Sequence, residues 1–239
     1  MLMLTLVIVP LGVQGDVGEP NQYATFLEDE TCTTVNSDNT IYYVMEAYRD
    51  TSKGVDHPFI LWLVQAYITP AAATGVGNPW YLRTGSSPTC IIDLYEPWHY
   101  RTTNPSDGIV KDEYKKFAPN SPIRQDPQGE VTYGISAEAG ILSPGGSVSS
   151  SYSVQWTQTV YAWGESTRAM TGSLYRVDGN LYDSSRNDEA VTFSCATNVE
   201  VTARGVLYVL PVNVEAFFVR GWWDTLTFRG TTGMAVTIY

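Results

Sequence analysis

Apolar and polar residues alternate strictly over residues 131–141, which is the clearest pattern in the chain. The apolar positions in this run are Val131, Tyr133, Ile135, Ala137, Ala139 and Ile141. A period of two residues is typical of a β-strand with one apolar face. After the turn-forming segment Ser143–Gly146, a second alternating run extends over residues 148–160. The two runs predict a long β-hairpin with one apolar face and one face that is rich in Ser and Thr.

Further strand-like runs occupy most of the remaining chain. Residues 59–69 (FILWLVQAYIT) are nearly all apolar and predict a central strand that is buried on both faces. Other strands are expected at residues 40–49, 90–95, 191–203, 206–219 and 234–239. The pattern predicts an all-β protein of about ten strands without a long helix. We expect an antiparallel β-sandwich of the jelly-roll or immunoglobulin-like type.

One domain is expected over residues 16–239, because no linker separates two apolar cores. Residues 96–129 contain five prolines and predict a long loop excursion, with one helical turn around residues 110–117. Residues 1–15 have an apolar run followed by the small-residue pattern Val13–Gly15, which favours a secretory signal peptide. The alternative is a first β-strand that is donated to a neighbouring subunit.

Composition and charge exclude several classes of protein. The 239 residues include 14 basic and 25 acidic side chains, for a formal net charge of −11. Binding to nucleic acid needs clustered Lys and Arg, so we expect no nucleic-acid partner. Only 16% of the residues are charged, which argues against a coiled coil or helical bundle. A secreted or cell-surface location fits this composition and the N-terminal segment.

No catalytic motif is present, and we do not expect an enzyme. The two histidines, His57 and His99, are too few for a histidine zinc site, and each is interpreted as a lone loop histidine. The chain has no G-x-S-x-G elbow and no phosphate-binding glycine loop. Its three cysteines, Cys32, Cys90 and Cys195, match no metal-binding spacing. In an exported chain two of them would form a disulfide, and the sequence leaves the pairing open.

Two sets of residues are candidates for ligand binding. Asp178, Asn180 and Asp183 lie close together in VDGNLYD and supply oxygen atoms of the kind that calcium prefers. No cofactor other than calcium is expected. Trp80, Trp98 and Tyr100 are candidates for stacking on sugar rings, although core packing is the commoner role of such residues.

The hairpin sequence YGISAEAGILSPGGSVSSSYSVQWTQ, residues 133–158, resembles hairpins in two groups of proteins. It is similar in style to uncharacterised secreted β-rich surface proteins of archaea. A similar alternating hairpin rich in Ser and Gly forms the stem of leukocidin-like pore toxins. The resemblance covers only residues 131–163 and lies in composition, so it implies no functional residue.

The leading functional hypothesis is a secreted structural protein that self-associates through β-strand edges into a filament, coat or surface layer. Charged side chains on an edge strand normally discourage its pairing with another chain, and the long strands predicted here contain few of them. An added strand from another subunit can pair with such an edge. The residues expected to take part in assembly are Leu4, Val7, Val9, Met234, Val236 and Ile238.

Two alternatives remain open at this point. One is a carbohydrate-binding module with glycan partners. The other is a pore-forming protein that inserts the hairpin of residues 131–160, since each run is long enough for the roughly 9–11 residues of a membrane strand. Under the leading hypothesis the partner is a second copy of the chain, and a membrane is not expected.

Overall fold

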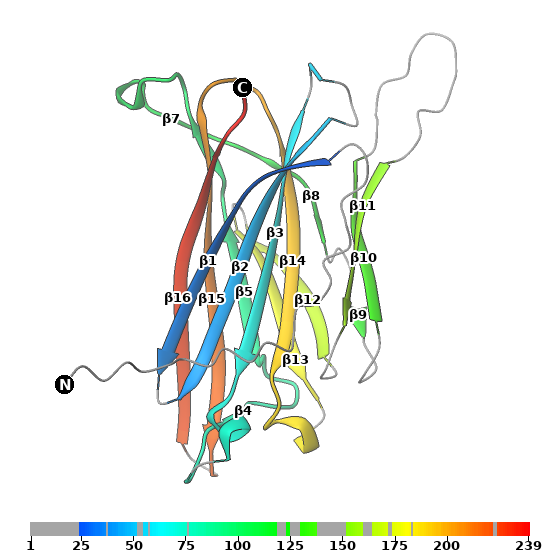
Figure 1. Ribbon diagram of the computed structural model, residues 1–239, viewed down its shortest axis with the longest axis vertical. Helices are drawn as coiled ribbons and strands as arrows, with labels where there is room; N and C mark the ends of the chain where they lie inside the picture. Colours follow the sequence, from blue (N-terminus) through cyan, green and yellow to red (C-terminus); the bar gives the residue numbers. More distant parts are fainter. Residues whose placement is uncertain are drawn as a thin grey trace, which may run out of the picture.

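The computed structural model describes residues 24–36, 38–51, 55–56, 58–75, 77–118, 123–124, 130–137, 152–159, 164–171, 174–182, 184–221 and 224–239. These residues form sixteen strands and three short 3-10 helices (Figure 1). The strands are β1 (Ala24–Asn36), β2 (Asn39–Asp50), β3 (Phe59–Thr69), β4 (Tyr81–Leu82), β5 (Cys90–Tyr95), β6 (Trp98–Tyr100), β7 (Ile109–Lys111), β8 (Tyr114–Ala118), β9 (Ile123–Arg124), β10 (Glu130–Ala137), β11 (Tyr152–Thr159), β12 (Gly164–Thr171), β13 (Leu174–Leu181), β14 (Val191–Glu200), β15 (Leu207–Arg220) and β16 (Asp224–Thr237). The 3-10 helices are η1 (Ala71–Thr74), η2 (Pro105–Asp107) and η3 (Ser184–Arg186).

The strands form two large antiparallel sheets and one separate two-stranded sheet. The first large sheet has the order β1-β2-β3-β14-β8. The second has nine strands, in the order β7-β6-β15-β5-β13-β12-β9, with β16 and β4 also paired to β15. The two-stranded sheet consists of β10 and β11. The prediction of an all-β antiparallel sandwich is confirmed.

The apolar core lies between the two large sheets. Alternate residues of β2, such as Ile41, Tyr43 and Met45, are fully buried and face the second sheet. The sheets approach each other closely at two glycines. A Cβ atom at Gly179 would overlap the ring of Phe193, and one at Gly230 would lie 2.9 Å from the ring of Tyr43. The rings of Phe193 and Tyr43 in the first sheet therefore occupy space that is free because Gly179 and Gly230 in the second sheet have no side chain.

The first sheet is also buried on its outer face around β3 and β14. Leu61 and Leu63 point away from the core side of β3, yet they are only 2% and 3% exposed. Ala196 stands opposite Leu63 on β14 and is fully buried. The prediction that residues 59–69 are buried on both faces is therefore confirmed.

Residues 96–129 differ from the predicted loop. They contain β6, β7, β8 and β9, and the predicted helical turn at residues 110–117 is wrong because these residues belong to β7 and β8. Strands of two to five residues, as here, are too short to show a period in the sequence. Short strands of this kind account for part of the difference between sixteen strands and the expected ten; β12 and β13, of eight residues each, were also not predicted. Within the described residues, no helix has the length and apolar character needed to cross a membrane.

Candidate functional site

The hairpin β10–β11 is paired differently from all other strands that the structure describes. Its two strands hydrogen-bond to each other over eight residue pairs and belong to neither large sheet. The register sets Tyr133 opposite Trp156, Ile135 opposite Val154 and Ala137 opposite Tyr152. Directly opposed residues of an antiparallel pair lie on the same face. The ladder therefore groups apolar residues with apolar residues at these three pairs, whereas the fourth pair on this face sets Val131 opposite Gln158.

The complementary set of positions on the hairpin is polar and uncharged. Thr132 is opposite Thr157, and Ser136 is opposite Ser153. Glu130, the first residue of β10, is the only charged residue in the two strands. The hairpin is thus amphipathic without the charges that would oppose its entry into an apolar medium.

In space the hairpin lies beside the first large sheet. β10 contacts β8 and β14, at the side where that sheet ends (Figure 1). The outer face of β3 and β14, which holds Leu61, Leu63 and Ala196, is the part of this sheet that is buried on its far side. Among the described strands, a hairpin that pairs only with itself thus neighbours a buried outer face that is apolar at Leu61, Leu63 and Ala196 and polar at Gln65, Ser194 and Asn198.

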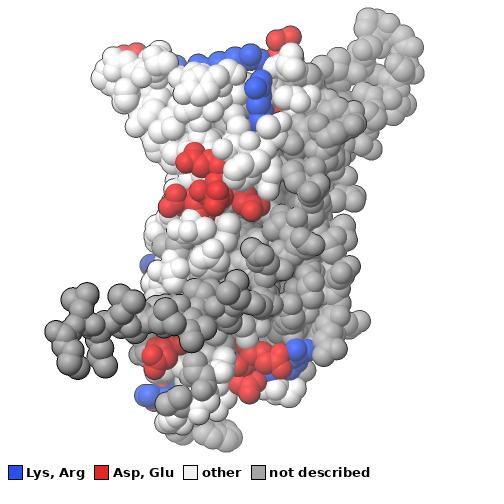
Figure 2. Space-filling model, viewed as in Figure 1, with Lys and Arg blue, Asp and Glu red and all other residues white. Residues whose placement is uncertain are grey.

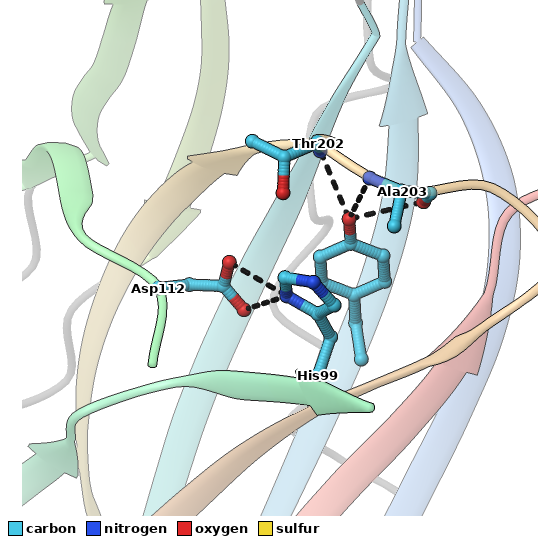
Figure 3. A network of polar contacts seen from close by, with 5 residues as sticks. His99, Asp112, Thr202 and Ala203 are labelled. Atoms are coloured by element: carbon cyan, nitrogen blue, oxygen red, sulfur yellow. Dashed lines mark hydrogen bonds and ion pairs between the residues drawn. The ribbon is translucent and has the colours of Figure 1, made fainter. Parts of the chain in front are cut away.

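His99 lies in a network of polar contacts at one end of the second sheet (Figure 3). Its Nδ1 atom lies 2.9 Å from both carboxylate oxygens of Asp112, and both side chains are almost completely buried. The imidazole ring stacks on Tyr208 at 4.7 Å between centroids. His99 is therefore a buried, paired residue, and the interpretation as a lone loop histidine is wrong.

The Tyr208 hydroxyl connects this network to the loop after β14. It accepts hydrogen bonds from the backbone N–H groups of Thr202 and Ala203 and donates one to the Ala203 carbonyl. Burial raises the pKa of Tyr208, and these hydrogen bonds oppose the rise. The hydroxyl is engaged on every side and the histidine is enclosed, so the network supports the fold at this end of the sandwich. The sequence did not indicate the role of Asp112, because its pairing depends on β6 and β7 lying side by side.

Two of the three cysteines are buried and free. Cys90 on β5 and Cys195 on β14 lie in the core, and neither forms a disulfide. Any pairing among three cysteines would need one of these two, so the predicted disulfide is not formed here. Burial raises the pKa of both thiols, and the nearby thiol of Cys195 adds to the effect on Cys90. A thiol that stays protonated reacts slowly, and the two residues serve as small apolar core residues. The side chain of Cys32 lies outside the described part.

The predicted sugar-stacking residues lie at two separate places and are partly buried. Trp80 packs against the core, and the Arg220 guanidinium lies 4.5 Å from the centre of its ring. Trp98 and Tyr100 alternate with His99 on β6, and their rings meet edge to face at 5.4 Å. The structure does not bring the three together, so a glycan site built from all three is not formed. Glycan binding by the Trp98–Tyr100 pair stays a prediction.

The predicted calcium residues lie on β13. Asp178 and Asn180 are two residues apart on this strand, and each has a buried side-chain oxygen without a hydrogen-bond partner. Asp183 lies outside the described residues. Within the described part no group of three His, Cys, Asp or Glu side chains gathers as a metal site would require. Calcium binding therefore remains a prediction that rests on the first two residues.

Of the residues predicted to mediate assembly, the structure describes those near the C-terminus but not those near the N-terminus. Leu4, Val7 and Val9 lie outside the described residues. Met234, Val236 and Ile238 are at most 2% exposed in the core, and β16 is paired with β15 over fourteen residues. The C-terminal strand thus completes the sheet of its own chain, and donation to another subunit would require this pairing to open.

The first strand carries the charges that were expected to be missing from sheet edges. β1 is the edge strand of the first sheet and holds the exposed residues Glu28, Asp29 and Glu30. Figure 2 shows acidic side chains grouped on the face that is viewed in Figure 1. Charged side chains on an edge strand discourage pairing with another chain. β1 is therefore protected against added strands.

Comparison with known proteins gives distant structural similarities only. No family model matches the sequence, and no curated protein matches it. The chain is similar to Clostridium perfringens delta-toxin, with a TM-score of 0.48 and 10% identity over 92% of this chain and 95% of that chain. It is also similar to a pore forming protein, with a TM-score of 0.43 and 9% identity over 93% and 96%.

A third similar structure is the Clostridium perfringens NetB toxin in its membrane-inserted form. The TM-score is 0.36, with 8% identity over 89% of this chain and 95% of that chain. Similarities at this level do not assign a function. The functional proposal below is accordingly drawn from the residues of this chain.

Proposed function

We propose that the protein is a secreted pore-forming protein that inserts the β10–β11 hairpin into a lipid bilayer. One observation carries this proposal: among the strands that the structure describes, the hairpin pairs only with itself, and its register sets Tyr133 opposite Trp156 and Ile135 opposite Val154. Leaving the sandwich would break no backbone ladder with either large sheet. The N-terminal segment, which has the pattern of a signal peptide, supports export from the cell.

The energetics favour insertion of one face of the hairpin. Burial of each large apolar side chain, such as Tyr133, Ile135 or Trp156, contributes about 1.5–3 kcal/mol. The opposing cost of burying charge is small, because Glu130 lies at the end of β10 and no other charged residue occurs in either strand. The alternation in the sequence continues to Ile141, which brings the first run to the roughly 9–11 residues that a bilayer requires. This extension adds one charged residue, Glu138, which falls in the polar set of alternating positions.

Self-association follows from the same hairpin. A single pair of strands leaves two unpaired backbone edges, and unpaired N–H and C=O groups cost several kcal/mol each in lipid. Several copies must therefore pair their hairpins edge to edge in a closed ring of strands. The self-association expected from the sequence is retained, but its purpose is the assembly of a pore and its partner includes a membrane.

The soluble form needs a place for the apolar face of the hairpin. β10 lies against β8 and β14, and the neighbouring outer face of β3 and β14 is apolar at Leu61, Leu63 and Ala196. We infer that this face shields the hairpin before insertion. The filament or coat hypothesis has no support among the described residues, and glycan binding has only the partly buried Trp98–Tyr100 pair.

A liposome leakage assay with two neighbouring substitutions tests the proposal. The full-length protein should release dye from vesicles. Val154→Lys places a charge in the apolar set, at a cost of about 2–4 kcal/mol per copy in the bilayer, and should abolish release. Ser153→Lys places the same charge one residue away in the polar set and should retain release.

The outcome is decided by the contrast between these two variants. Both should keep the circular dichroism spectrum of the unmodified protein, since the hairpin pairs with neither large sheet. Absence of leakage with the unmodified protein at every lipid composition and concentration would refute the proposal. Equal leakage by the two variants would refute the assigned face.

A further inference from the structure

Two oxygen atoms on the outer face of the second sheet are buried without a partner. They are Oδ1 of Asp178 and Oδ1 of Asn180, both on β13. Residues two apart on a strand lie on the same face, and the residues between and beside them, such as Val177, face the core. A buried acceptor without a hydrogen bond is unusual in a folded protein and requires an explanation.

The charge of Arg176 acts on Asp178, but its guanidinium is bound to another carboxylate. Arg176 lies on the same face of β13, but its guanidinium binds both carboxylate oxygens of Asp93, at 2.6 Å and 2.9 Å. Burial raises the pKa of Asp178; the charge of Arg176 lowers it, and that of Asp93 raises it further. The carboxylate of Asp178 is thus partly removed from water, and the neighbouring guanidinium of Arg176 is already bound to Asp93.

The amide of Asn180 is oriented with its oxygen free. Asn180 is only 6% exposed, and its Nδ2 atom lies 3.4 Å from the Tyr182 hydroxyl, to which it donates. This interaction uses the donor end of the amide and leaves Oδ1 as a free acceptor. A carboxylate oxygen and an amide oxygen, two residues apart on one face of β13, are therefore both buried and both without a hydrogen-bond donor.

We propose that Asp178 and Asn180 bind a calcium ion on the outer face of β13. Calcium prefers carboxylate and amide oxygens, and water completes its six to eight ligands where the protein supplies few. In the β12–β13 register Thr167 stands opposite Asp178, and Glu165 stands opposite Asn180. A site with so few protein ligands is weak, with a dissociation constant on the order of 10⁻⁴–10⁻³ M, which suits an extracellular protein.

Terbium luminescence on the full-length protein, without lipid, tests this site. Tb³⁺ takes the place of Ca²⁺ and is excited through nearby tyrosine or tryptophan, so Ca²⁺ should compete with the signal. Asp178→Asn should weaken binding by about tenfold or more, because ligand charge sets affinity at such sites. Asn180→Asp adds a carboxylate at the same position and should tighten binding.

Asp188→Asn is the matched control, because Asp188 is an exposed acidic residue ten positions further along the chain. It should bind Tb³⁺ and Ca²⁺ as the unmodified protein does. Thermal melting provides a second readout: Ca²⁺ should raise the Tm of the unmodified protein, whereas Asp178→Asn should gain nothing. In EDTA the Asp178→Asn variant should melt at or above the Tm of the unmodified protein, because it removes an uncompensated buried charge.

Three results would overturn the site. These are no Ca²⁺-competed signal at millimolar concentrations, equal affinity of Asp178→Asn and Asp188→Asn, and no gain of affinity in Asn180→Asp. Because the assay contains no membrane, failure here leaves the pore-forming proposal intact, and failure of dye release leaves this site intact.

Discussion

Two antiparallel hairpins of this protein have opposite relations to the rest of the fold. β15 and β16 pair over fourteen residues, and β15 also pairs with β4, β5 and β6. β10 and β11 pair over eight residues with each other alone. The first hairpin cannot move without breaking the second sheet, whereas the second can move with its whole ladder intact.

The side chains of the fixed hairpin reinforce this difference. Across β15 and β16, Glu215 forms an ion pair with Arg229, and Thr231 donates to Asn213 at 3.2 Å. The β10–β11 pair contains a single charged residue. Polar cross-strand pairs help to fix the register of a sheet that faces solvent. A pair of strands with a single charge at one end can exchange contact with water for contact with lipid at a lower cost. The comparison teaches that, among the described strands, the hairpin proposed to insert differs from the others in pairing with neither large sheet.

The largest effect on stability is expected from truncation in the fixed hairpin. Phe218 on β15 is 1% exposed, so Phe218→Ala should lower the free energy of unfolding by about 3–5 kcal/mol. Tyr133→Ala on β10 should cost clearly less, because β10 pairs with neither large sheet. Urea unfolding followed by circular dichroism measures both, and equal losses would contradict the comparison.

The next effect concerns the close approach of the two large sheets. Gly179→Ala places a methyl group in the ring of Phe193 and should destabilise the fold by about 3 kcal/mol. Phe193→Leu in the same chain should recover part of this loss by vacating the space. If the double variant is as unstable as the sum of the single variants, the two residues are not in the contact that the structure shows.

A smaller loss is expected at the ion pair on the outer face of the second sheet. Asp93 is 2% exposed and depends on Arg176 for both carboxylate oxygens. Arg176→Gln should cost about 1–3 kcal/mol, toward the lower value because water reaches the partly exposed arginine. Asp93→Asn together with Arg176→Gln should cost less than Arg176→Gln alone, and a calorimetric Tm series will show whether this holds.

The smallest effect is a pH dependence at Asp178. Its pKa is raised in the folded state by burial, so its protonated form is favoured there. The stability that this group contributes is complete below the pKa of the unfolded chain and is lost as the pH rises through the folded pKa. In EDTA, the free energy of unfolding of the unmodified protein should therefore fall relative to that of Asp178→Asn as the pH rises above the ordinary pKa of aspartate. A difference that is constant with pH would contradict the raised pKa.

Elements that repeat a clear period over many residues were predictable from the sequence, whereas β12 and β13, of eight residues each, were not predicted. The alternation of residues 131–141 and the apolar run of residues 59–69 predicted a hairpin and a strand that is buried on both faces, and both are present. The register of β10–β11 was not predicted and comes from the structure. Short strands such as β6 and β7 carry too few residues for a period and were taken for loop.

The buried polar pairs were beyond prediction for a different reason. His99 and Asp112 are thirteen residues apart, and Arg176 and Asp93 are eighty-three apart, so only the pairing of strands brings them together. Asp178 and Asn180 could be singled out because calcium ligands cluster locally in sequence. Met234, Val236 and Ile238 were predicted to mediate assembly because they alternate along a strand. Their burial shows that the same alternation also suits a strand that packs in the core of its own chain.

Fluorescent labelling of successive hairpin residues tests the central claim most directly. In a background with the three cysteines replaced, single cysteines at positions 133–136 would carry an environment-sensitive dye. On addition of vesicles, the account predicts a shift to lipid-like emission at positions 133 and 135 and water-like emission at 134 and 136. Emission that is unchanged by vesicles at all four positions would contradict insertion of the β10–β11 hairpin.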